Sequence, residues 1–405
     1  MDKTFLETNN TVTIIDTAEV LVVGGGPAGT AAAIAAARTG AKTVLLERYG
    51  HLGGMASGGE VILIPALSTD KEIQIRGVML EIMERLTALK NGVCGPDIKI
   101  TGSTEPQDVG SWKPYFDMVR YNSVSYGGFV EPELLKIVLN EMMEENGVTV
   151  YLHSLACKAI VKAAKVEGVI FESKQGRNAV LADAVIDCTG DGDIFASAGV
   201  EFEVEFVGGC GGCGGIVHSV SRTSSMAVVY RLGGADFAKH AEYFTTNAAE
   251  WKAHEVKMNE IAGYEMKIFP TSRNDVVWVD NWLLGYDCLK IKDLTAVEFA
   301  VRRTLLKIID YINSNNIPGL EDVWLYDTAS QIGTRGSRRV KGEYRMTVED
   351  MNGRTFDDTV AVIPAAVNPR LPNIPSNIPL RTLIAAGKDN LFVAGRCFSS
   401  DVTAN

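Results

Sequence analysis

The sequence predicts an α/β fold in which a Rossmann-like, dinucleotide-binding domain carries an inserted α+β domain. Three observations lead to this prediction. A glycine-rich turn joins a strand to a helix near the N-terminus, two later apolar strands each end in a tight polar turn, and the stretch between those strands follows a different pattern. We therefore assign 16–204 and 355–405 to one discontinuous domain and 205–354 to the insertion.

Composition sets limits on the class of protein. A chain of 405 residues with 46% hydrophobic residues is long enough to fold as two globular domains. The net charge of −11 argues against a partner such as nucleic acid or an anionic membrane surface. No apolar run is long enough to cross a bilayer. Seven cysteines, an odd number, suggest reduced thiols and a cytoplasmic location.

The first motif lies in residues 19–47, "EVLVVGGGPAGTAAAIAAARTGAKTVLLE". The apolar run 19–23 is typical of a strand, and the alanine-rich run 28–38 is typical of a helix. Gly24, Gly26 and Gly29 form G-x-G-x-x-G between the two. Gly40 ends the helix, and a second strand runs to Glu47. This context makes the motif much more specific than its three glycines alone.

Each residue type in this motif has a physical task. Gly24 permits the tight turn, Gly26 lets the backbone approach a pyrophosphate, and Gly29 lets the helix pack close to the strand. The helix N-terminus, at Pro27 and Ala28, offers free N–H groups to an anion. Glu47 stands 18 residues after Gly29, where an acid can bind a ribose diol. We expect a dinucleotide here.

The loop that follows Glu47, "ERYGHLGGMAS", indicates which dinucleotide binds. It contains Arg48, the glycine pair Gly53-Gly54, and Met55. In NAD enzymes the chain normally enters another helix at this point. In flavoproteins of the glutathione-reductase type, a loop with paired glycines returns to the pyrophosphate and the flavin. This resemblance favours FAD and a glutathione-reductase type of fold.

Two later segments resemble the other FAD contacts of such flavoproteins. "ADAVIDCTGDGDIFASAG" (182–199) is an apolar strand followed by a turn, and "DNLFVAGRCFSSD" (389–401) is another buried strand that ends in a turn. The resemblance implies that the chain meets FAD again at Thr189, Gly190, Asp191, Asp193, Gly395 and Arg396, with Asp401 as a further acid. We expect the adenine side near Ala156.

Taken together, the chain resembles the FAD-dependent oxidoreductase family that includes the flavin subunit of heterodisulfide reductase. The segments that resemble it are "GGGPAG", "LLERYGHLGGMAS", "VIDCTGDGDI", "ASQIGTRGSRRVKGEY" and "NLFVAGRC". The resemblance covers nearly the whole chain. It implies a redox enzyme with FAD as its cofactor, and says little about the substrate.

Periodicity predicts the other elements. Apolar residues recur at helical spacing in 75–89, 132–145 and 295–315, and 148–154 is a strand. The run 158–183 predicts antiparallel strands that turn at "KQGR". In the insertion, 225–234 and 275–284 have the composition of strands, and we expect this substrate or cap domain to cover the flavin.

The loop 204–218, "VEFVGGCGGCGGIVH", admits several interpretations. It contains a second G-x-G-x-x-G, but no helix start follows, so a second nucleotide site is disfavoured. Cys210 and Cys213 lack the further ligands of a zinc site, and we expect no metal. We favour a mobile loop, with a redox disulfide as the alternative.

The main functional hypothesis is hydride transfer between a small organic substrate and FAD, with an external electron donor or acceptor. One alternative is an FAD-dependent monooxygenase, because "GDGDIFASAG" is similar to a G-D-G-x-x-S segment of aromatic hydroxylases. Another is a flavin-binding electron-transfer subunit. Candidate catalytic residues are Arg338, Cys397 and His218. Assembly into a homo-oligomer is left open.

Overall fold

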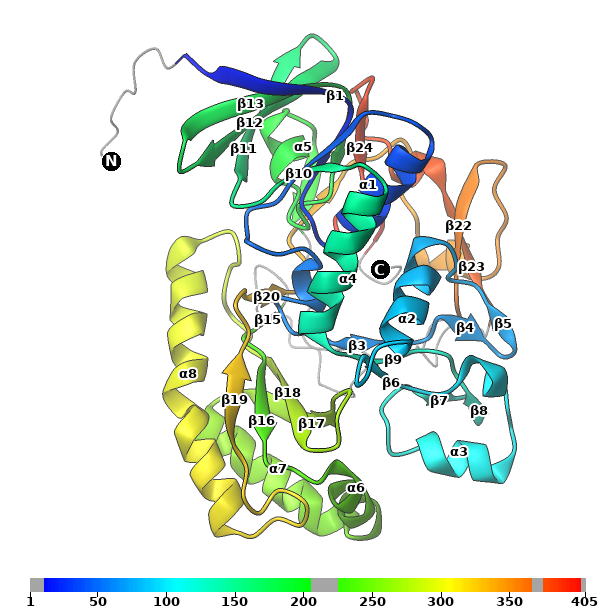
Figure 1. The fold of residues 1–405 in the computed structure, drawn as a ribbon, viewed down its shortest axis with the longest axis vertical. Coiled ribbons are helices and arrows are strands. Elements are labelled where there is room, and N and C mark those ends of the chain that lie inside the picture. The colour runs from blue at the N-terminus through cyan, green and yellow to red at the C-terminus, as the bar shows by residue number, and fades with distance from the viewer. Residues whose placement is uncertain (1–10, 205–224, 366–373, 402–405) are drawn as a thin grey trace.

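The computed structural model describes residues 11–204, 225–365 and 374–401. Its largest sheet joins segments that lie far apart in the sequence (Figure 1). The parallel strands are β1 (Thr13–Val23), β2 (Thr43–Leu46), β10 (Thr149–Tyr151), β13 (Gly176–Asp187) and β24 (Leu391–Val393). The antiparallel strands β11 (Leu155–Lys162) and β12 (Lys165–Ser173) extend the sheet beyond β13, which confirms the predicted run of antiparallel strands. The N- and C-terminal parts of the chain therefore share one sheet, as the discontinuous domain requires.

The strand β1 is covered on both faces at its carboxyl end. Val22 packs into the cluster formed with helix α1 (Pro27–Arg38), whereas Leu21 and Val23 pack into a second cluster on the other face. Helices α2 (Val78–Thr87) and α4 (Pro132–Glu145) complete the first layer, and the short helix α5 (Asp193–Ser197) contributes to the second. This is the arrangement of a parallel sheet buried between layers.

The register of the parallel strands brings their carboxyl ends to one line. Val23 pairs with Leu46 on one side and with Asp187 on the other, and Asp187 pairs with Val393. The four turns that follow these strands therefore leave the sheet at the same edge. In open α/β sheets this edge is where ligands bind.

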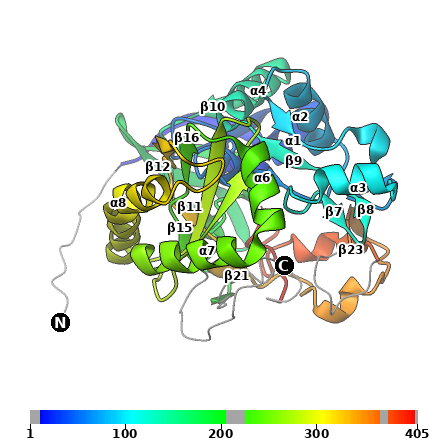
Figure 2. The ribbon, with the colours of Figure 1, turned by 90° about the horizontal axis from the view of Figure 1, so that it is seen from below.

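A second, antiparallel sheet lies in the insertion, in the order β17-β18-β16-β19. Its strands are β16 (Tyr230–Gly233), β17 (Glu265–Pro270), β18 (Val276–Trp282) and β19 (Trp324–Thr328). Helices α6 (Phe237–Thr246), α7 (Ala248–Ala262) and α8 (Ile291–Ser314) surround it in the view from below (Figure 2). The buried positions of α8, among them Val297, Val301, Leu305, Ile308 and Ile312, follow the spacing of three and four that predicted the helix, which begins four residues earlier than expected.

Smaller elements connect these layers. The short strands pair as β3 (Leu63–Ile64), β9 (Gly128–Val130) and β6 (Val93–Cys94); β4 (Ser68–Thr69) with β5 (Glu72–Ile73); β7 (Val119–Arg120) with β8 (Ser123–Val124); β14 (Phe202–Val204) with β21 (Arg338–Val340); β15 (Met226–Ala227) with β20 (Gly333–Thr334); and β22 (Thr359–Ile363) with β23 (Ser376–Pro379). Helix α3 (Pro106–Trp112) lies beside the β7–β8 hairpin in Figure 1. Within the described residues, no helix is long and apolar enough to cross a membrane.

The insertion and the first domain share part of their core. Phe269, Trp278 and Trp282 of the insertion belong to the same buried cluster as Val22 and Leu45. At the far end of the insertion, Val340 packs in the cluster on the other face of the main sheet. The domain boundaries at 205 and 354 stay a prediction. Val340, which belongs to the predicted insertion, packs with the first domain.

A buried ion network also joins the two parts. Arg231 on β16 is 2% exposed, and it donates to both carboxylate oxygens of Asp327, at 3.0 and 2.5 Å, and to Glu131 Oε1 at 3.0 Å. Glu131 precedes helix α4 of the first domain, so this one guanidinium bridges the two. A third carboxyl group, Glu60, is buried close by, and its Oε2 has no hydrogen-bond partner in the described structure.

Glu60 makes stability depend on pH. Burial, reinforced by the charge of Asp327 and opposed by that of Arg231, raises the pKa of Glu60 to about 8. The folded state holds this proton more tightly than the unfolded state, so the free energy of unfolding falls as pH rises from about 4.5 to about 8. We expect Glu60→Gln to remove this fall and to stabilise the protein by up to about 5 kcal/mol above pH 8.

Urea unfolding of the wild type and of Glu60→Gln at pH 6 and pH 9 checks this expectation. Glu141→Gln is the matched control, because the Glu141 side chain is exposed on helix α4 and is not among the charges that act on Glu60. An equal change for both variants at both pH values would show that Glu60 does not hold a proton in the folded protein.

Candidate cofactor-binding site

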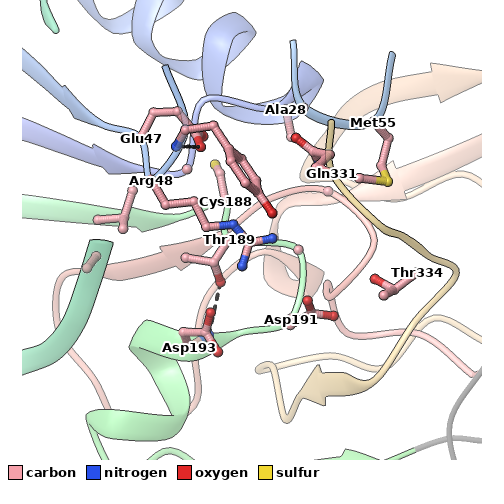
Figure 3. Close-up of a pocket in the computed structure, with 18 of the residues that line it drawn as sticks. Ala28, Glu47, Arg48, Met55, Cys188, Thr189, Asp191, Asp193, Gln331 and Thr334 are labelled. Carbon is pink, nitrogen blue, oxygen red and sulfur yellow. Dashed lines mark hydrogen bonds between the residues drawn. The ribbon is translucent and has the colours of Figure 1, made fainter. Parts of the chain in front are cut away.

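A cavity of about 410 Å³ lies at the carboxyl edge of the main sheet. Its walls come from the four turns that the register brings together and from the insertion (Figure 3). The lining residues include Gly24, Gly26, Pro27, Ala28, Glu47, Arg48, Gly54, Met55, Ala156, Cys188, Thr189, Gly190, Asp191, Asp193, Cys288, Leu294, Gln331, Ile332, Thr334, Gly395 and Arg396. The cavity therefore collects residues from stretches of the chain that lie far apart in the sequence.

The three glycines of the first motif are required for different reasons. Gly24 has φ +100°, and a Cβ there would lie 2.5 Å from the carbonyl oxygen of Cys188. A Cβ at Gly29 would lie 1.8 Å from the carbonyl oxygen of Gly24, so this glycine lets α1 pack against the turn. Both positions are glycine because the protein itself leaves no room.

Gly26 differs, because the protein does not exclude a side chain there. Its φ is −71°, which any residue adopts, and the nearest atom to a Cβ would be the Gly54 Cα at 3.9 Å. Gly26 caps α1, whose first-turn amides have no acceptor within the helix. The absence of a side chain at Gly26 is explained by a ligand that must come close to the backbone here. A pyrophosphate that accepts hydrogen bonds from the first-turn amides of α1 fits this site, which we call the pyrophosphate cradle.

Glu47 is held at the end of β2 by backbone donors. The N–H of Gly25 donates to Oε2 at 2.6 Å, and the N–H of Tyr49 donates to Oε1 at 2.8 Å. The side chain is 6% exposed and lines the cavity. A carboxylate accepts about four hydrogen bonds, so capacity is left for the two hydroxyls of a ribose.

Two cations line the cavity, and they have different partners. The guanidinium of Arg48 stacks on the ring of Tyr49, 4.8 Å from its centroid, and in Figure 3 it points toward the middle of the cavity. That of Arg396 donates to Asp191 Oδ1 at 2.9 Å. Burial alone would lower the pKa of Arg396, but the charge of Asp191 raises it. Arg48 is thus the lining cation whose charge no described carboxylate neutralises by an ion pair.

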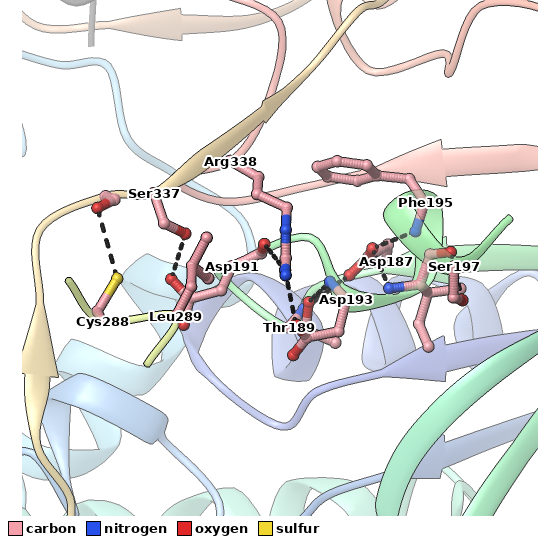
Figure 4. Close-up of polar contacts among 12 residues, drawn as sticks. Asp187, Thr189, Asp191, Asp193, Phe195, Ser197, Cys288, Leu289, Ser337 and Arg338 are labelled. Atoms are coloured by element: carbon pink, nitrogen blue, oxygen red, sulfur yellow. Dashed lines mark hydrogen bonds and ion pairs between the residues drawn. The ribbon is translucent and has the colours of Figure 1, made fainter. Parts of the chain in front are cut away.

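The turn after β13 is organised by a buried carboxylate that the sequence analysis did not single out (Figure 4). Asp187 Oδ1 accepts from the N–H and the hydroxyl of Thr189, and Oδ2 accepts from the N–H groups of Ile194 and Phe195. These bonds fold the turn 187–195 around one side chain and cap α5. An acid at the carboxyl end of an otherwise apolar strand is the signal that marks such a residue.

The same turn presents Asp191 to the cavity. The Ser337 hydroxyl donates to Asp191 Oδ1 at 2.7 Å, beside the bond from Arg396. Burial opposes ionisation of this carboxyl group, but the charge of Arg396 and these hydrogen bonds outweigh it and lower the pKa of Asp191. Asp191 is therefore a carboxylate in the folded protein.

The observations fit a dinucleotide with an adenosine ribose at Glu47 and a pyrophosphate at Gly26. The sequence model of a family described as FAD dependent oxidoreductase matches residues 19–405. The chain belongs to the FAD-dependent oxidoreductase family. Its cofactor is FAD, and the cavity at the carboxyl edge has the residues to hold it.

Solved structures provide comparisons at low identity, and no curated protein sequence matches the chain significantly. A geranylgeranyl bacteriochlorophyll reductase-like protein from Thermoplasma acidophilum is 15% identical, with a TM-score of 0.46, and the alignment covers 94% of this chain and 71% of that one. The p-nitrophenol 4-monooxygenase PnpA from Pseudomonas putida DLL-E4 is 14% identical, with a TM-score of 0.45, and the alignment covers 82% of this chain and 70% of that one. The myxobacterial chondrochloren halogenase CndH is 13% identical, with a TM-score of 0.47, and the alignment covers 96% of this chain and 70% of that one.

Most of the residues predicted to contact FAD line the cavity. Those that do are Gly24, Gly26, Pro27, Ala28, Glu47, Arg48, Gly54, Met55, Ala156, Thr189, Gly190, Asp191, Asp193, Gly395 and Arg396. Gly29 and Gly53 do not reach it and act on the backbone instead: the Gly53 N–H donates to the carbonyl oxygen of Gly25 at 2.8 Å and holds the returning loop. His218 and the 204–218 cysteines lie outside the described residues.

Three further predicted residues, Arg338, Asp401 and Cys397, do not line the FAD cavity. Arg338 donates to the carbonyl oxygen of Asp191 and to Asp193 Oδ1, both at 2.9 Å, so it supports the turn from behind (Figure 4). Asp401 Oδ2 accepts from the N–H of Val348. Cys397 is fully buried, and burial raises the pKa of its thiol well above the ordinary value, which opposes a nucleophilic role.

The sequence analysis missed the wall that the insertion contributes. It consists of Cys288, Leu294, Gln331, Ile332 and Thr334. Hydrogen bonds tie this segment to the first domain, because the N–H of Gln331 and the hydroxyl of Ser330 both donate to the carbonyl oxygen of Gly58. Gln331, Ile332 and Thr334 lie in the segment "ASQIGTRGSRRVKGEY" that resembles the family, but only tertiary packing brings these five residues to the site. Within the described residues, no three His, Cys, Asp or Glu side chains could hold a metal ion.

Proposed function

We propose that this FAD-dependent oxidoreductase transfers a hydride between a small organic substrate and FAD, with a separate electron donor or acceptor completing the cycle. When bound, FAD supplies the redox chemistry by accepting or donating a hydride. The chain's own residues bind the cofactor and shape the place where the substrate meets it. The insertion is the part of the chain that we expect to hold the substrate.

The observation that supports this proposal most is that the described residues of the insertion form a neutral wall. Cys288, Leu294, Gln331, Ile332 and Thr334 carry no carboxylate and no cation, whereas the turns of the first domain contribute Glu47, Arg48, Asp191, Asp193 and Arg396. A hydride leaves carbon with its electron pair, and the proton that the donor also loses from oxygen or nitrogen passes to water, so the step needs no charged side chain on this wall. A neutral wall suits that step and the binding of an uncharged substrate.

The returning loop supports a glutathione-reductase type of FAD site. Gly54 approaches the first motif so closely that a Cβ on it would lie 2.8 Å from the Gly26 Cα. The paired glycines thus bring the loop 53–57 back beside the pyrophosphate cradle, as the sequence comparison implied.

The described cysteines Cys94, Cys157, Cys188, Cys288 and Cys397 form no disulfide, which supports a reducing, cytoplasmic location.

Anaerobic reduction of the purified holoprotein tests the proposal. A panel of alcohols, amines and hydroxy acids is added in turn, and the visible absorption of the flavin is followed. We expect one donor class to bleach it without oxygen, with a product lighter by two hydrogen atoms. Bleaching by NAD(P)H alone, with a product that gains an oxygen atom in air, would contradict the proposal and indicate a monooxygenase. Bleaching by a protein partner alone would indicate an electron-transfer subunit.

A further inference from the structure

Gln331 is a buried polar residue in the FAD cavity, and its side-chain carbonyl oxygen has no hydrogen-bond partner among the residues that the structure describes. It is 5% exposed and lines the cavity, and its Oε1 is buried without a partner among the described residues. Figure 3 draws it between Ala28 and Met55, among lining residues from the first domain. Buried carboxamides normally form hydrogen bonds, so this one calls for an explanation.

The backbone around Gln331 holds the carboxamide in place. Its own N–H donates to the carbonyl oxygen of Gly58 at 3.0 Å, and the Ser330 hydroxyl donates to the same oxygen. A Cβ at Gly58 would lie 2.1 Å from the His51 ring and 3.0 Å from Gln331 Oε1, so this glycine leaves room for both side chains. The hydrogen bonds of the Gln331 N–H and the Ser330 hydroxyl to Gly58 therefore fix the Gln331 carboxamide at the cavity wall without using its own polar atoms.

A carboxamide carries one acceptor and two donors, and rotation about its last bond exchanges them. It therefore complements a ligand that also presents a carbonyl next to an N–H. The other polar parts of FAD have better partners here, because the pyrophosphate suits Gly26 and the cations, and the adenosine ribose suits Glu47. The pyrimidine edge of the flavin ring, with an N–H between two carbonyls, is the part whose chemistry matches.

We infer that the Gln331 carboxamide hydrogen-bonds to the pyrimidine edge of FAD and thereby positions the flavin ring against the insertion. Gln331 is then a cofactor-positioning residue supplied by the insertion. This inference rests on FAD as the cofactor and is independent of which substrate the enzyme uses.

Gln331→Leu tests the inference, because leucine keeps the bulk and removes both hydrogen-bonding functions. Apoprotein is titrated with FAD, and the dissociation constant, the visible spectrum and the midpoint potential of the bound flavin are measured. We expect the dissociation constant to rise about tenfold, the loss of one neutral hydrogen bond. The spectrum and the potential should also shift, since the contact is made to the ring.

A second variant and a control make the test independent of folding. Gln331→Glu keeps an acceptor but adds a negative charge, which opposes the added electron density of the reduced ring, so its potential should lie below that of Gln331→Leu. Gln175→Leu, at the exposed β12–β13 turn, should change none of the three quantities. Circular dichroism confirms that each apoprotein is folded.

Three results would overturn the inference. An unchanged dissociation constant, spectrum and potential in both Gln331 variants would show that the side chain does not touch FAD. A weaker dissociation constant with an unchanged spectrum and potential would place the contact on the ribityl chain instead of the ring. Loss of turnover with intact FAD binding would likewise assign Gln331 to the substrate.

Discussion

Replacing Gly26 by valine is expected to abolish FAD binding while the protein stays folded. A Cβ at this position meets no protein atom closer than 3.9 Å, so the apoprotein accommodates the change. The added side chain would occupy the space in which a pyrophosphate must approach the backbone amides at the start of α1. We expect the dissociation constant for FAD to rise by at least about 100-fold. Fluorescence titration of the apoprotein with FAD measures it.

Gly24→Val provides the contrasting control. Gly24 has φ +100°, and its Cβ would lie 2.5 Å from the carbonyl oxygen of Cys188, so this variant should lose the fold together with the cofactor. Gly26→Val should keep the circular dichroism spectrum and unfolding temperature of the wild-type apoprotein. Normal FAD uptake by Gly26→Val would refute the placement of the pyrophosphate.

Arg231→Met is expected to destabilise the protein by about 3–5 kcal/mol. Methionine fills much of the space, but it leaves the carboxylates of Glu131 and Asp327 without their shared cation, next to the buried Glu60. The loss should appear as a lower free energy of unfolding in urea at pH 7. Because Glu131 belongs to the first domain and Arg231 to the insertion, the two parts should also unfold less cooperatively.

The control for this prediction is Arg273→Met. Arg273 pairs with Asp275 in an exposed turn of the insertion, where an ion pair is worth at most about 1 kcal/mol. If both arginine variants lose the same small amount, the buried network does not hold the parts together. Combining Arg231→Met with Glu131→Gln and Asp327→Asn should recover much of the stability, since no buried charge then stands alone.

Local patterns predicted the parts of the fold that depend on short-range physics. Helix α4 spans the predicted range 132–145 because its apolar residues recur at helical spacing and Pro132 stands at its first position. The first motif could be recognised because a turn, a helix N-terminus and a strand-end acid must stand at fixed distances. The convergence of Gly24, Thr189 and Gly395 was implied by the resemblance to FAD-binding flavoproteins, and the register of the parallel strands, which end at one edge, accounts for it.

The remaining features depend on contacts between distant segments, which single-sequence patterns do not carry. Arg338 was a candidate catalytic residue on the family resemblance, but in the structure it donates to a carbonyl oxygen and a carboxylate of the turn after β13. Gln331 reaches the cavity only because its segment bonds to Gly58, some 270 residues earlier. Glu60 was missed because the charges that act on it, Arg231 and Asp327, belong to two distant strands of the insertion.

Identification of the cofactor released from the purified protein tests the central claim most directly. The protein is denatured by heat, and the supernatant is separated by chromatography beside FAD, FMN and NAD standards. The account predicts FAD in near-stoichiometric amount, or its uptake to that level when apoprotein is incubated with FAD. Release of NAD alone, with no uptake of flavin, would contradict the assignment of the cavity at the carboxyl edge.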